Sequence, residues 1–208
     1  MCQNKICVNM GFTDESFPEG THMCMIYSNE SERKKIISQF LEGGLSSGEK
    51  VTYFVDEASP DEIMTWLSEM GVAIPETSKG ASFNIATTAE TYHPTGIFEP
   101  EKMLNTLKAY YETAKGENYM ASRVTGEMSW ALKGIPGSDL LMVYESKVND
   151  VVEKYPVTAI CQYDANKFDG ATIFECLKVH PFMIVHGQIV KNPYYMKTDD
   201  YLEERSGQ

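Results

Sequence analysis

Histidine and cysteine are the residue types in this sequence that most readily do chemistry, because their nitrogen and sulfur atoms bind zinc and other transition metals. Their spacings match no standard structural zinc module, and no CxxC pair is present. Cysteine is also among the most buried residue types without any chemical role. Two interpretations therefore stay open, a metal site shared between strands or an ordinary core. The candidates are His22, Cys24, Cys161, Cys176, His180 and His186.

A second group of reactive side chains lies where apolar, strand-like segments end. Tyr27, Arg123 and Tyr163 fall at or near such ends, and acids occur there at Asp56 and Glu57. The carboxyl ends of parallel strands lie along one edge of an open sheet, where ligands bind. These groups therefore predict a pocket with a polar rim. The aromatic residues that either wall this pocket or join the core are Trp130, Tyr144 and Tyr163.

Arg123 and Glu127 form the most specific hypothesis at this edge. Gly126 allows a sharp backbone turn after the strand, so Glu127 is expected to return toward Arg123. As a sensing pair, Arg123 would hold an anionic group of a ligand, and Glu127 would orient Arg123 or accept a hydrogen bond from the ligand. Trp130 would cover an apolar part of that ligand. The alternative is a structural ion pair.

The sequence does not contain a complete phosphate-binding loop. Residues 43–50 read GGLSSGEK, which superficially resembles a phosphate-binding loop, but Glu49 separates Gly48 from Lys50. The segment also follows a helical pattern instead of a strand, so it predicts a helix-to-strand turn. The loop after the first strand contains no glycine, and Glu30 and Glu32 there would repel an anion. The HExxH pattern of zinc proteases is not found.

The composition limits the classes of partner. The 208 residues carry 18 basic and 30 acidic side chains, and the net charge of −12 opposes a general nucleic-acid partner. No apolar run approaches the roughly 20 residues of a membrane span. Five cysteines, an odd number, occur without a signal peptide, which predicts reduced thiols and a cytoplasmic location.

Strands are expected to alternate with helices along the chain. The expected strands are 21–28, 50–57, 81–87, 119–125, 156–163 and 182–190, and the expected helices are 30–44, 59–71, 100–115, 139–154 and 170–179. His22 and Cys24 lie two residues apart and should share one face of the first strand. The pattern predicts an α/β fold, with a mostly parallel central sheet flanked by helices on both faces. Residues 1–16 are expected to be a flexible arm, 17–195 a single domain, and 196–208 a polar tail.

Several phrases together resemble a known family. They are GTHMCMIY at 20–27, FLEGGL at 40–45 with GEK at 48–50, RVTGEMSW at 123–130, YE at 144–145, CQYD at 161–164, HP at 180–181 and NPYY at 192–195. In this order they resemble the MEDS domain, the methanogen/methylotroph sensory domain, over about residues 17–195. The resemblance implies a RecA/KaiC-like core without the Walker A loop. It also implies sensing of small C1 or hydrocarbon-derived compounds, often beside histidine kinases or DNA-binding domains.

The main hypothesis is a stand-alone, non-enzymatic sensory domain. It would bind a small ligand and signal through a partner such as a histidine kinase or a transcription regulator, with no direct contact to nucleic acid or membrane. No motif calls for a cofactor, but Cys24 and Cys161 would be thiolate ligands if a metal or corrinoid is involved. The alternatives are a degenerate RecA-like nucleotide-binding protein, a metal- or cofactor-binding enzyme, and a scaffold with a vestigial pocket. The candidate ligand-binding residues are His22, Cys24, Tyr27, Arg123, Glu127, Trp130, Cys161, Tyr163 and His180.

Overall fold

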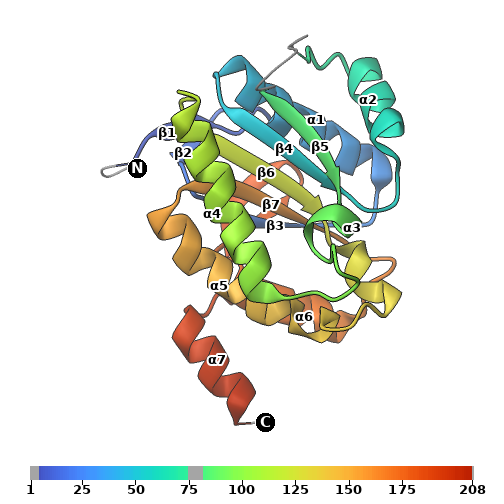
Figure 1. The fold of residues 1–208 in the computed structure, drawn as a ribbon, viewed down its shortest axis with the longest axis vertical. Coiled ribbons are helices and arrows are strands. Elements are labelled where there is room, and N and C mark those ends of the chain that lie inside the picture. Colours follow the sequence, from blue (N-terminus) through green and yellow to red (C-terminus); the bar gives the residue numbers. More distant parts are fainter. Residues whose placement is uncertain (1–4, 75–81, 208) are drawn as a thin grey trace.

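A seven-stranded sheet forms the centre of the structure, a computed structural model that describes residues 5–74 and 82–207 (Figure 1). The strands follow the order β5-β4-β6-β7-β3-β8-β9. Their bounds are β3 (His22–Tyr27), β4 (Lys50–Val55), β5 (Phe83–Thr87), β6 (Ser122–Glu127), β7 (Val157–Asp164), β8 (Phe182–Val185) and β9 (Gln188–Lys191). Only the β8–β9 pair of this sheet is antiparallel. The predicted mostly parallel α/β sheet is therefore confirmed.

Helices cover both faces of the sheet, and Figure 1 shows α4 crossing in front of the strands while α1 lies behind them. One face carries α1 (Glu30–Ser46) and α2 (Pro60–Glu69), and the other carries α4 (Pro100–Gly116), α5 (Leu141–Lys154) and α6 (Gly170–Val179). The shorter elements are α3 (Thr88–Thr91), the 3-10 helices η1 (Met128–Lys133) and η2 (Ser138–Leu140), and α7 (Thr198–Ser206). Within residues 5–74 and 82–207, no helix has the length and apolarity that a bilayer crossing needs.

The strands bury both of their faces because side chains alternate between two apolar layers. In β3, Met23 and Met25 join the core under α1, whereas Cys24 joins the core under α4, α5 and α6. His22 lies on the same side as Cys24, where it contacts Cys161 of the neighbouring strand. The prediction that His22 and Cys24 share a face is confirmed.

The first helix runs past the point where the sequence suggested that it ends. It continues through Gly43 and Gly44 to Ser46, and Gly48 follows with a positive φ of 73°. A Cβ atom at Gly43 would lie 3.0 Å from the backbone of Gly11, and one at Gly44 would lie 2.5 Å from the Arg123 side chain. The two glycines therefore allow close packing and do not terminate the helix.

The expected last strand, 182–190, is instead a hairpin of two strands. His186 and Gly187 connect β8 to β9, and both have positive φ angles, 48° and 72°. This conformation is typical of the tight two-residue turns that suit the twist of antiparallel strands. The turn exposes 91% of the His186 side chain, so this histidine lies apart from the other histidines and cysteines that were considered as metal ligands.

The two ends of the chain are more ordered than the sequence suggested. β1 (Cys7–Asn9) pairs with β2 (Ser16–Pro18), and Val8 and Met10 are buried in the core under α1. The expectation of a flexible arm is therefore wrong for the described part of 1–16. Cys7 is disulfide-bonded, so the expectation of reduced thiols fails at this position, and Cys2 lies outside the described residues. In the expected tail, α7 buries Tyr201 against α5 and α6.

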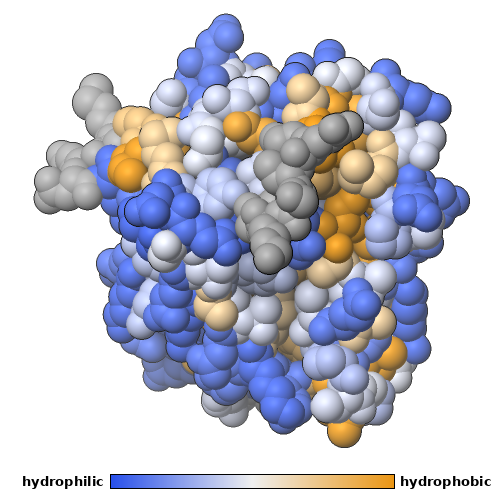
Figure 2. Space-filling view, turned by 45° about the horizontal axis from the view of Figure 1, so that its top comes forward, coloured by the Kyte–Doolittle hydropathy of each residue, from blue (hydrophilic) through white to orange (hydrophobic). Residues whose placement is uncertain are grey.

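The surface reflects the acidic composition. Figure 2 shows hydrophilic side chains over most of one face of the molecule, with apolar side chains gathered in a strip at the upper right. Among the described residues, Met64 and Met70 near α2 are examples of large apolar side chains that remain exposed.

Candidate functional site

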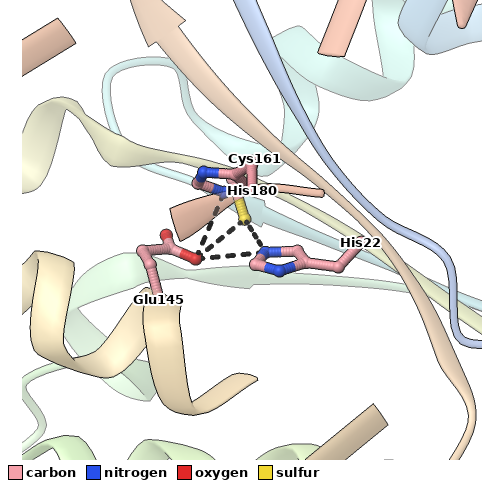
Figure 3. A group of neighbouring side chains, drawn as sticks. All are labelled: His22, Glu145, Cys161 and His180. Atoms are coloured by element: carbon pink, nitrogen blue, oxygen red, sulfur yellow. Dashed lines mark hydrogen bonds and ion pairs between the residues drawn. The ribbon is translucent and has the colours of Figure 1, made fainter. Parts of the chain in front are cut away.

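A buried group of four side chains is the most reactive arrangement in the described residues (Figure 3). His22 begins β3, Cys161 lies in β7, Glu145 belongs to α5, and His180 directly follows α6. The side chains of His22, Glu145 and His180 have no exposed surface, and Cys161 is also buried. In the parallel pair of β3 and β7, Cys161 lies opposite Cys24, and His22, two residues before Cys24 on the same face, reaches Cys161 diagonally. The helices α5 and α6 bring the other two residues against them. We refer to these four residues as the tetrad.

The reactive atoms of the tetrad face one another at short distances. His22 Nε2 lies 3.2 Å from Glu145 Oε2 and 3.4 Å from Cys161 Sγ. Glu145 Oε2 also lies 3.4 Å from Cys161 Sγ and 3.5 Å from His180 Nε2. His180 Nε2 makes this approach without a well-aligned hydrogen bond, so it is a buried nitrogen that lacks a partner. All four atoms lie within 4.8 Å of one another.

The outer atoms of both imidazoles have fixed partners. Asn149 donates its amide hydrogens to the backbone carbonyls of Ser146 and Val179, which leaves its Oδ1 3.0 Å from His22 Nδ1. His180 Nδ1 lies 2.8 Å from the carbonyl oxygen of Cys176. Oxygen accepts in both contacts, so each Nδ1 carries a hydrogen, and in the neutral form of either ring Nε2 then presents its lone pair. Both lone pairs point into the tetrad.

Tyr163 fixes the orientation of the carboxyl group. Its hydroxyl donates to Glu145 Oε1 at 3.0 Å, which leaves Oε2 for the tetrad. Burial raises the pKa of Glu145, but contacts with His180 and His22 outweigh burial and hold the pKa well below its usual range. Burial and the nearby carboxylate of Glu145 raise the pKa values of Cys161 and Tyr163, so both stay protonated in the absence of a cation. The tetrad thus contains an ionised carboxylate deep in the protein.

These donors are suited to a metal ion. Two imidazole nitrogens, one thiol and one carboxylate oxygen form a set that zinc and similar ions accept. A second group, Cys24, Cys176 and His180, also lies close together. It is a weaker candidate because His180 Nδ1 is already engaged by a carbonyl oxygen and Cys24 Sγ lies 3.7 Å from the carbonyl of Phe182. Of the nine predicted ligand-binding residues, the structure brings His22, Cys161, Tyr163 and His180 together, with Cys24 adjacent.

A cavity of about 360 Å³ opens beside the tetrad. Its walls include His22 and Asn149 together with apolar side chains such as Val152, Pro181 and Phe182. A second cavity, of about 260 Å³, lies at the carboxyl end of β3, and Tyr27 and Ile36 line it. The expected location at the strand carboxyl ends thus has a cavity, but only Tyr27 of the nine candidates lines that one.

Glu127 belongs to a separate buried network on the α1 face of the sheet. Its Oε1 accepts from Tyr53 at 2.6 Å and from Arg33 at 3.1 Å, and its Oε2 accepts from the backbone N–H groups of Asp56 and Glu57. Arg33 also pairs with Glu30 in the first turn of α1. Burial and Glu127 raise the pKa of Tyr53 well above its ordinary value. The carboxylate of Glu127 is therefore fully engaged within the protein.

Arg123 and Glu127 do not form the expected pair. The two residues share a face of β6, but four residues of strand separate their Cα atoms by about 13 Å. Arg123 instead forms a two-bond ion pair with Glu49 and donates to the carbonyl oxygen of Phe40 at 2.6 Å. Both members of this pair are fully buried. The prediction that Arg123 and Glu127 point into one pocket is wrong, because β6 continues to Glu127 and does not turn at Gly126.

Trp130 lies in the aromatic part of the core. Its ring centroid is 4.7 Å from that of Phe98 and 5.1 Å from that of Tyr92, and the residue has no exposed surface. Tyr144 packs against the same two aromatic rings. Trp130 and Tyr144 therefore belong to the hydrophobic core and do not form walls of a pocket at the strand ends.

Sequence reasoning missed Glu145, which completes the tetrad, and Asn149, which orients His22. A signal for Glu145 was present in the helix pattern. Leu141, Glu145, Val148 and Val152 recur at helical spacing, and all four are buried. A carboxylate at an apolar-face position requires a buried partner, because an unpaired charge in the core is costly.

Comparison with known proteins gives one family and one fold. The family model described as MEDS, the MEthanogen/methylotroph, DcmR Sensory domain, matches residues 21–181. The transcriptional repressor DcmR of Methylorubrum extorquens is 24% identical over 160 residues, which are 76% of this chain and 57% of the repressor. The chain thus spans little more than half the length of that relative.

Solved structures share the fold at low identity. A KaiC-like protein of Pyrococcus horikoshii OT3 aligns with a TM-score of 0.61 at 20% identity, over 87% of this chain and 80% of that protein. The flagellar accessory protein FlaH of Methanocaldococcus jannaschii aligns with a TM-score of 0.61 at 14% identity, over 89% of this chain and 84% of FlaH. The predicted RecA/KaiC-like fold is confirmed.

Proposed function

Because this chain belongs to the MEDS family of sensory domains, we propose that it binds a small molecule and passes the binding event to a partner protein without catalysing a reaction. The observation that carries this proposal is the cavity against the tetrad, since His22 belongs to both. A molecule in the cavity would lie against a residue whose side chain is held in the buried core.

The cavity suits a small ligand. Its volume of about 360 Å³ lies at the lower end of the range for small-molecule sites, roughly 300–1,000 Å³. Its walls combine apolar side chains such as Val152, Pro181 and Phe182 with several polar or charged residues, which are Lys5, Glu19, Thr21, His22, Asn149, Glu153 and Tyr195. This mixture suits a compact compound with an apolar part and hydrogen-bonding groups, and the C1 or hydrocarbon-derived class that the family resemblance implies includes such compounds.

Signal output is expected to need a partner. The repressor relative is named for transcriptional control, and this chain covers only 57% of it. The net charge of −12 opposes direct binding of this domain to DNA. We therefore propose a protein partner such as a histidine kinase or a transcription regulator, whose activity depends on whether the cavity is filled.

Nucleotide hydrolysis is not part of the proposal. At the start of α1 the Asn29 side chain accepts from the Glu32 amide, and Glu30 pairs with Arg33. The carboxylates of Glu30 and Glu32 there oppose an anionic phosphate. Isothermal titration with ATP and magnesium tests this point, and clear binding would favour the alternative of a nucleotide-binding protein.

Two substitutions that enlarge a side chain test which of the two cavities binds the ligand. Val152 lines the cavity beside the tetrad and Ile36 lines the one beside Tyr27, and each is 4% exposed. Saturation-transfer NMR with methanol, methylamine and dimethyl sulfide should detect binding to the wild type. Val152→Phe should abolish the signal because it fills the first cavity, whereas Ile36→Phe should preserve it. Loss only in Ile36→Phe would move the site to the second cavity, and no binding of any probe would contradict the ligand class.

A further inference from the structure

We propose that His22, Glu145, Cys161 and His180 bind one divalent transition-metal ion, with zinc as the ion that fits best. The inference stands on the tetrad alone and holds whether or not the neighbouring cavity binds a ligand. Four observations support it: an unbalanced set of acceptors, the spacing of the donor atoms, the outer hydrogen bonds and the chemical type of the donors.

The acceptors in the tetrad outnumber the hydrogens available to them. The Nδ1 hydrogens of His22 and His180 are used by Asn149 Oδ1 and the Cys176 carbonyl, so both Nε2 atoms present lone pairs. Glu145 Oε2 adds a carboxylate oxygen, and the thiol of Cys161 supplies a single hydrogen. His180 Nε2 is left without a hydrogen-bond partner. These three acceptors share too few hydrogens, and a cation placed among them would satisfy all three.

A proton is the simplest alternative cation, and the close packing of two fully buried imidazoles opposes a proton on each of them. The two rings lie only 4.3 Å apart between centroids, so two imidazolium ions would repel each other strongly. A metal ion satisfies both nitrogens at once, whereas a single proton satisfies one.

Four of the six separations between the donor atoms are close to those of a tetrahedral zinc site. Zinc binds nitrogen and oxygen at about 2.0–2.2 Å and sulfur at about 2.3 Å, which places neighbouring donor atoms of a tetrahedron about 3.3–3.7 Å apart. The measured separations are 3.2, 3.4, 3.4 and 3.5 Å, and all four donor atoms lie within 4.8 Å of one another. Small shifts of these side chains would place the ion among them.

The outer hydrogen bonds are those that metal ligands require. Histidine ligands usually donate their second ring hydrogen to an oxygen, which fixes the ring and its tautomer, and ligating carboxylates are in turn hydrogen-bonded. Asn149, the Cys176 carbonyl and the hydroxyl of Tyr163 fill these roles. The set of nitrogen, sulfur and one oxygen favours zinc, cobalt or iron over calcium and magnesium, which prefer oxygen ligands only. Four protein ligands indicate a closed site of the structural type.

Metal binding releases one proton. The Cys161 S–H bond breaks, the thiolate bonds to the ion, and the proton passes to solvent, while both histidines bind in their neutral form.

Metal content tests the proposal directly. The full chain is prepared without a histidine tag and stripped of metal with a chelator. It is then dialysed against zinc and separated from free metal, and its zinc content is measured by elemental mass spectrometry. We expect one zinc per chain in the wild type and in Cys176→Ser, a control that alters an equally buried cysteine of the neighbouring group. Cys161→Ser should lower zinc affinity at least about 100-fold, and Asn149→Leu about 10–100-fold through the orientation of His22.

Cobalt provides a readout that does not depend on the stability of a variant. Co²⁺ bound to the wild type should give intense tetrahedral ligand-field bands and a thiolate-to-metal charge-transfer band. The charge-transfer band should disappear in Cys161→Ser and persist in Cys176→Ser. Wild-type protein that retains no zinc and gives no such cobalt spectrum would overturn the proposal. Loss of the band in Cys176→Ser with retention in Cys161→Ser would also overturn it and assign the metal to the second group.

Discussion

The buried ion pair of Arg123 and Glu49 should control the stability of this domain. Arg123 Nε donates to Glu49 Oε2 at 2.7 Å, and its two terminal nitrogens donate to Glu49 Oε1, the Phe40 carbonyl and, at 2.8 Å, the Asn9 carbonyl. The pair joins β6 to α1, β1 and the turn before β4. Arg123→Met keeps much of the side-chain volume and removes the charge and every donor.

The expected loss of stability in Arg123→Met comes from the unpaired carboxylate of Glu49. Neither side chain has any exposed surface, so Glu49 would become an unpaired charge in the core. Removing one partner of a buried pair costs about 3–5 kcal/mol. For a domain of this size each kcal/mol lowers the melting temperature by roughly 2–4 °C, so the expected decrease is about 6–20 °C.

Urea unfolding followed by tryptophan fluorescence measures the free energy of unfolding of each variant. Lys102→Met is the matched control, because Lys102 pairs with Glu99 on the surface and their side chains are 63% and 43% exposed. Such a surface pair is worth about 0–1 kcal/mol. The double variant Arg123→Met with Glu49→Met removes the stranded charge, so it should be more stable than Arg123→Met alone.

Two results would refute this reasoning. A loss below about 1 kcal/mol in Arg123→Met would mean that the pair behaves like a solvent-exposed one. A double variant that is less stable than the single variant would mean that the stranded Glu49 charge is not the source of the loss. In that case the donors to the backbone carbonyls of Phe40 and Asn9 would carry the stability.

Three further results are expected. Gly44→Ala should lower the melting temperature although alanine favours helices, because the new Cβ would lie 2.5 Å from the fully buried Arg123; a higher melting temperature would contradict the tight packing. Burial and the bond to Glu175 raise the pKa of Tyr201 from 10.0 to about 12, so its stabilising effect, complete below pH 10, should be lost as the pH rises through 12. Between pH 10 and 12 the melting temperature of the wild type should therefore fall more steeply with pH than that of Tyr201→Phe. An equal pH dependence in the two proteins would contradict a stabilising role for the Tyr201 hydroxyl. Among the described residues, the free cysteines Cys24, Cys161 and Cys176 are buried, so timed alkylation should label them only after unfolding, and fast labelling of these three in the folded protein would contradict their burial.

Much of the fold could be predicted from the sequence because helices and strands depend on the local periodicity of apolar residues. Apolar, β-rich runs such as Lys50–Val55 and amphipathic runs such as Pro100–Gly116 appear where strands and helices were expected. Their alternation is sufficient to predict a mostly parallel sheet with helices on both faces. The boundaries that failed depend on distant contacts. Gly43 and Gly44 read as a helix end because the sequence does not reveal that Gly11 and Arg123 pack against them.

The candidate site was only partly readable for the same reason. His22, Cys161 and His180 were recognisable by residue type, and the shared face of His22 and Cys24 follows from the two-residue period of a strand. Glu145 was hidden in a helix about 15 residues before Cys161 in the chain. A helical period places Glu145 on a buried face, but it says nothing about which residues lie opposite.

The sequence by itself determined the types of element, the family and the residues able to bind a metal or a ligand. The tertiary structure alone decided their partners. It pairs Arg123 with Glu49 and Glu127 with Arg33, and it aims two histidine lone pairs at Glu145. The physical reason is that a buried charge or lone pair is satisfied by whatever the packing of distant segments brings within about 3 Å. That packing depends on the register of β3 against β7 and on the placement of α5 and α6, which local sequence patterns do not encode.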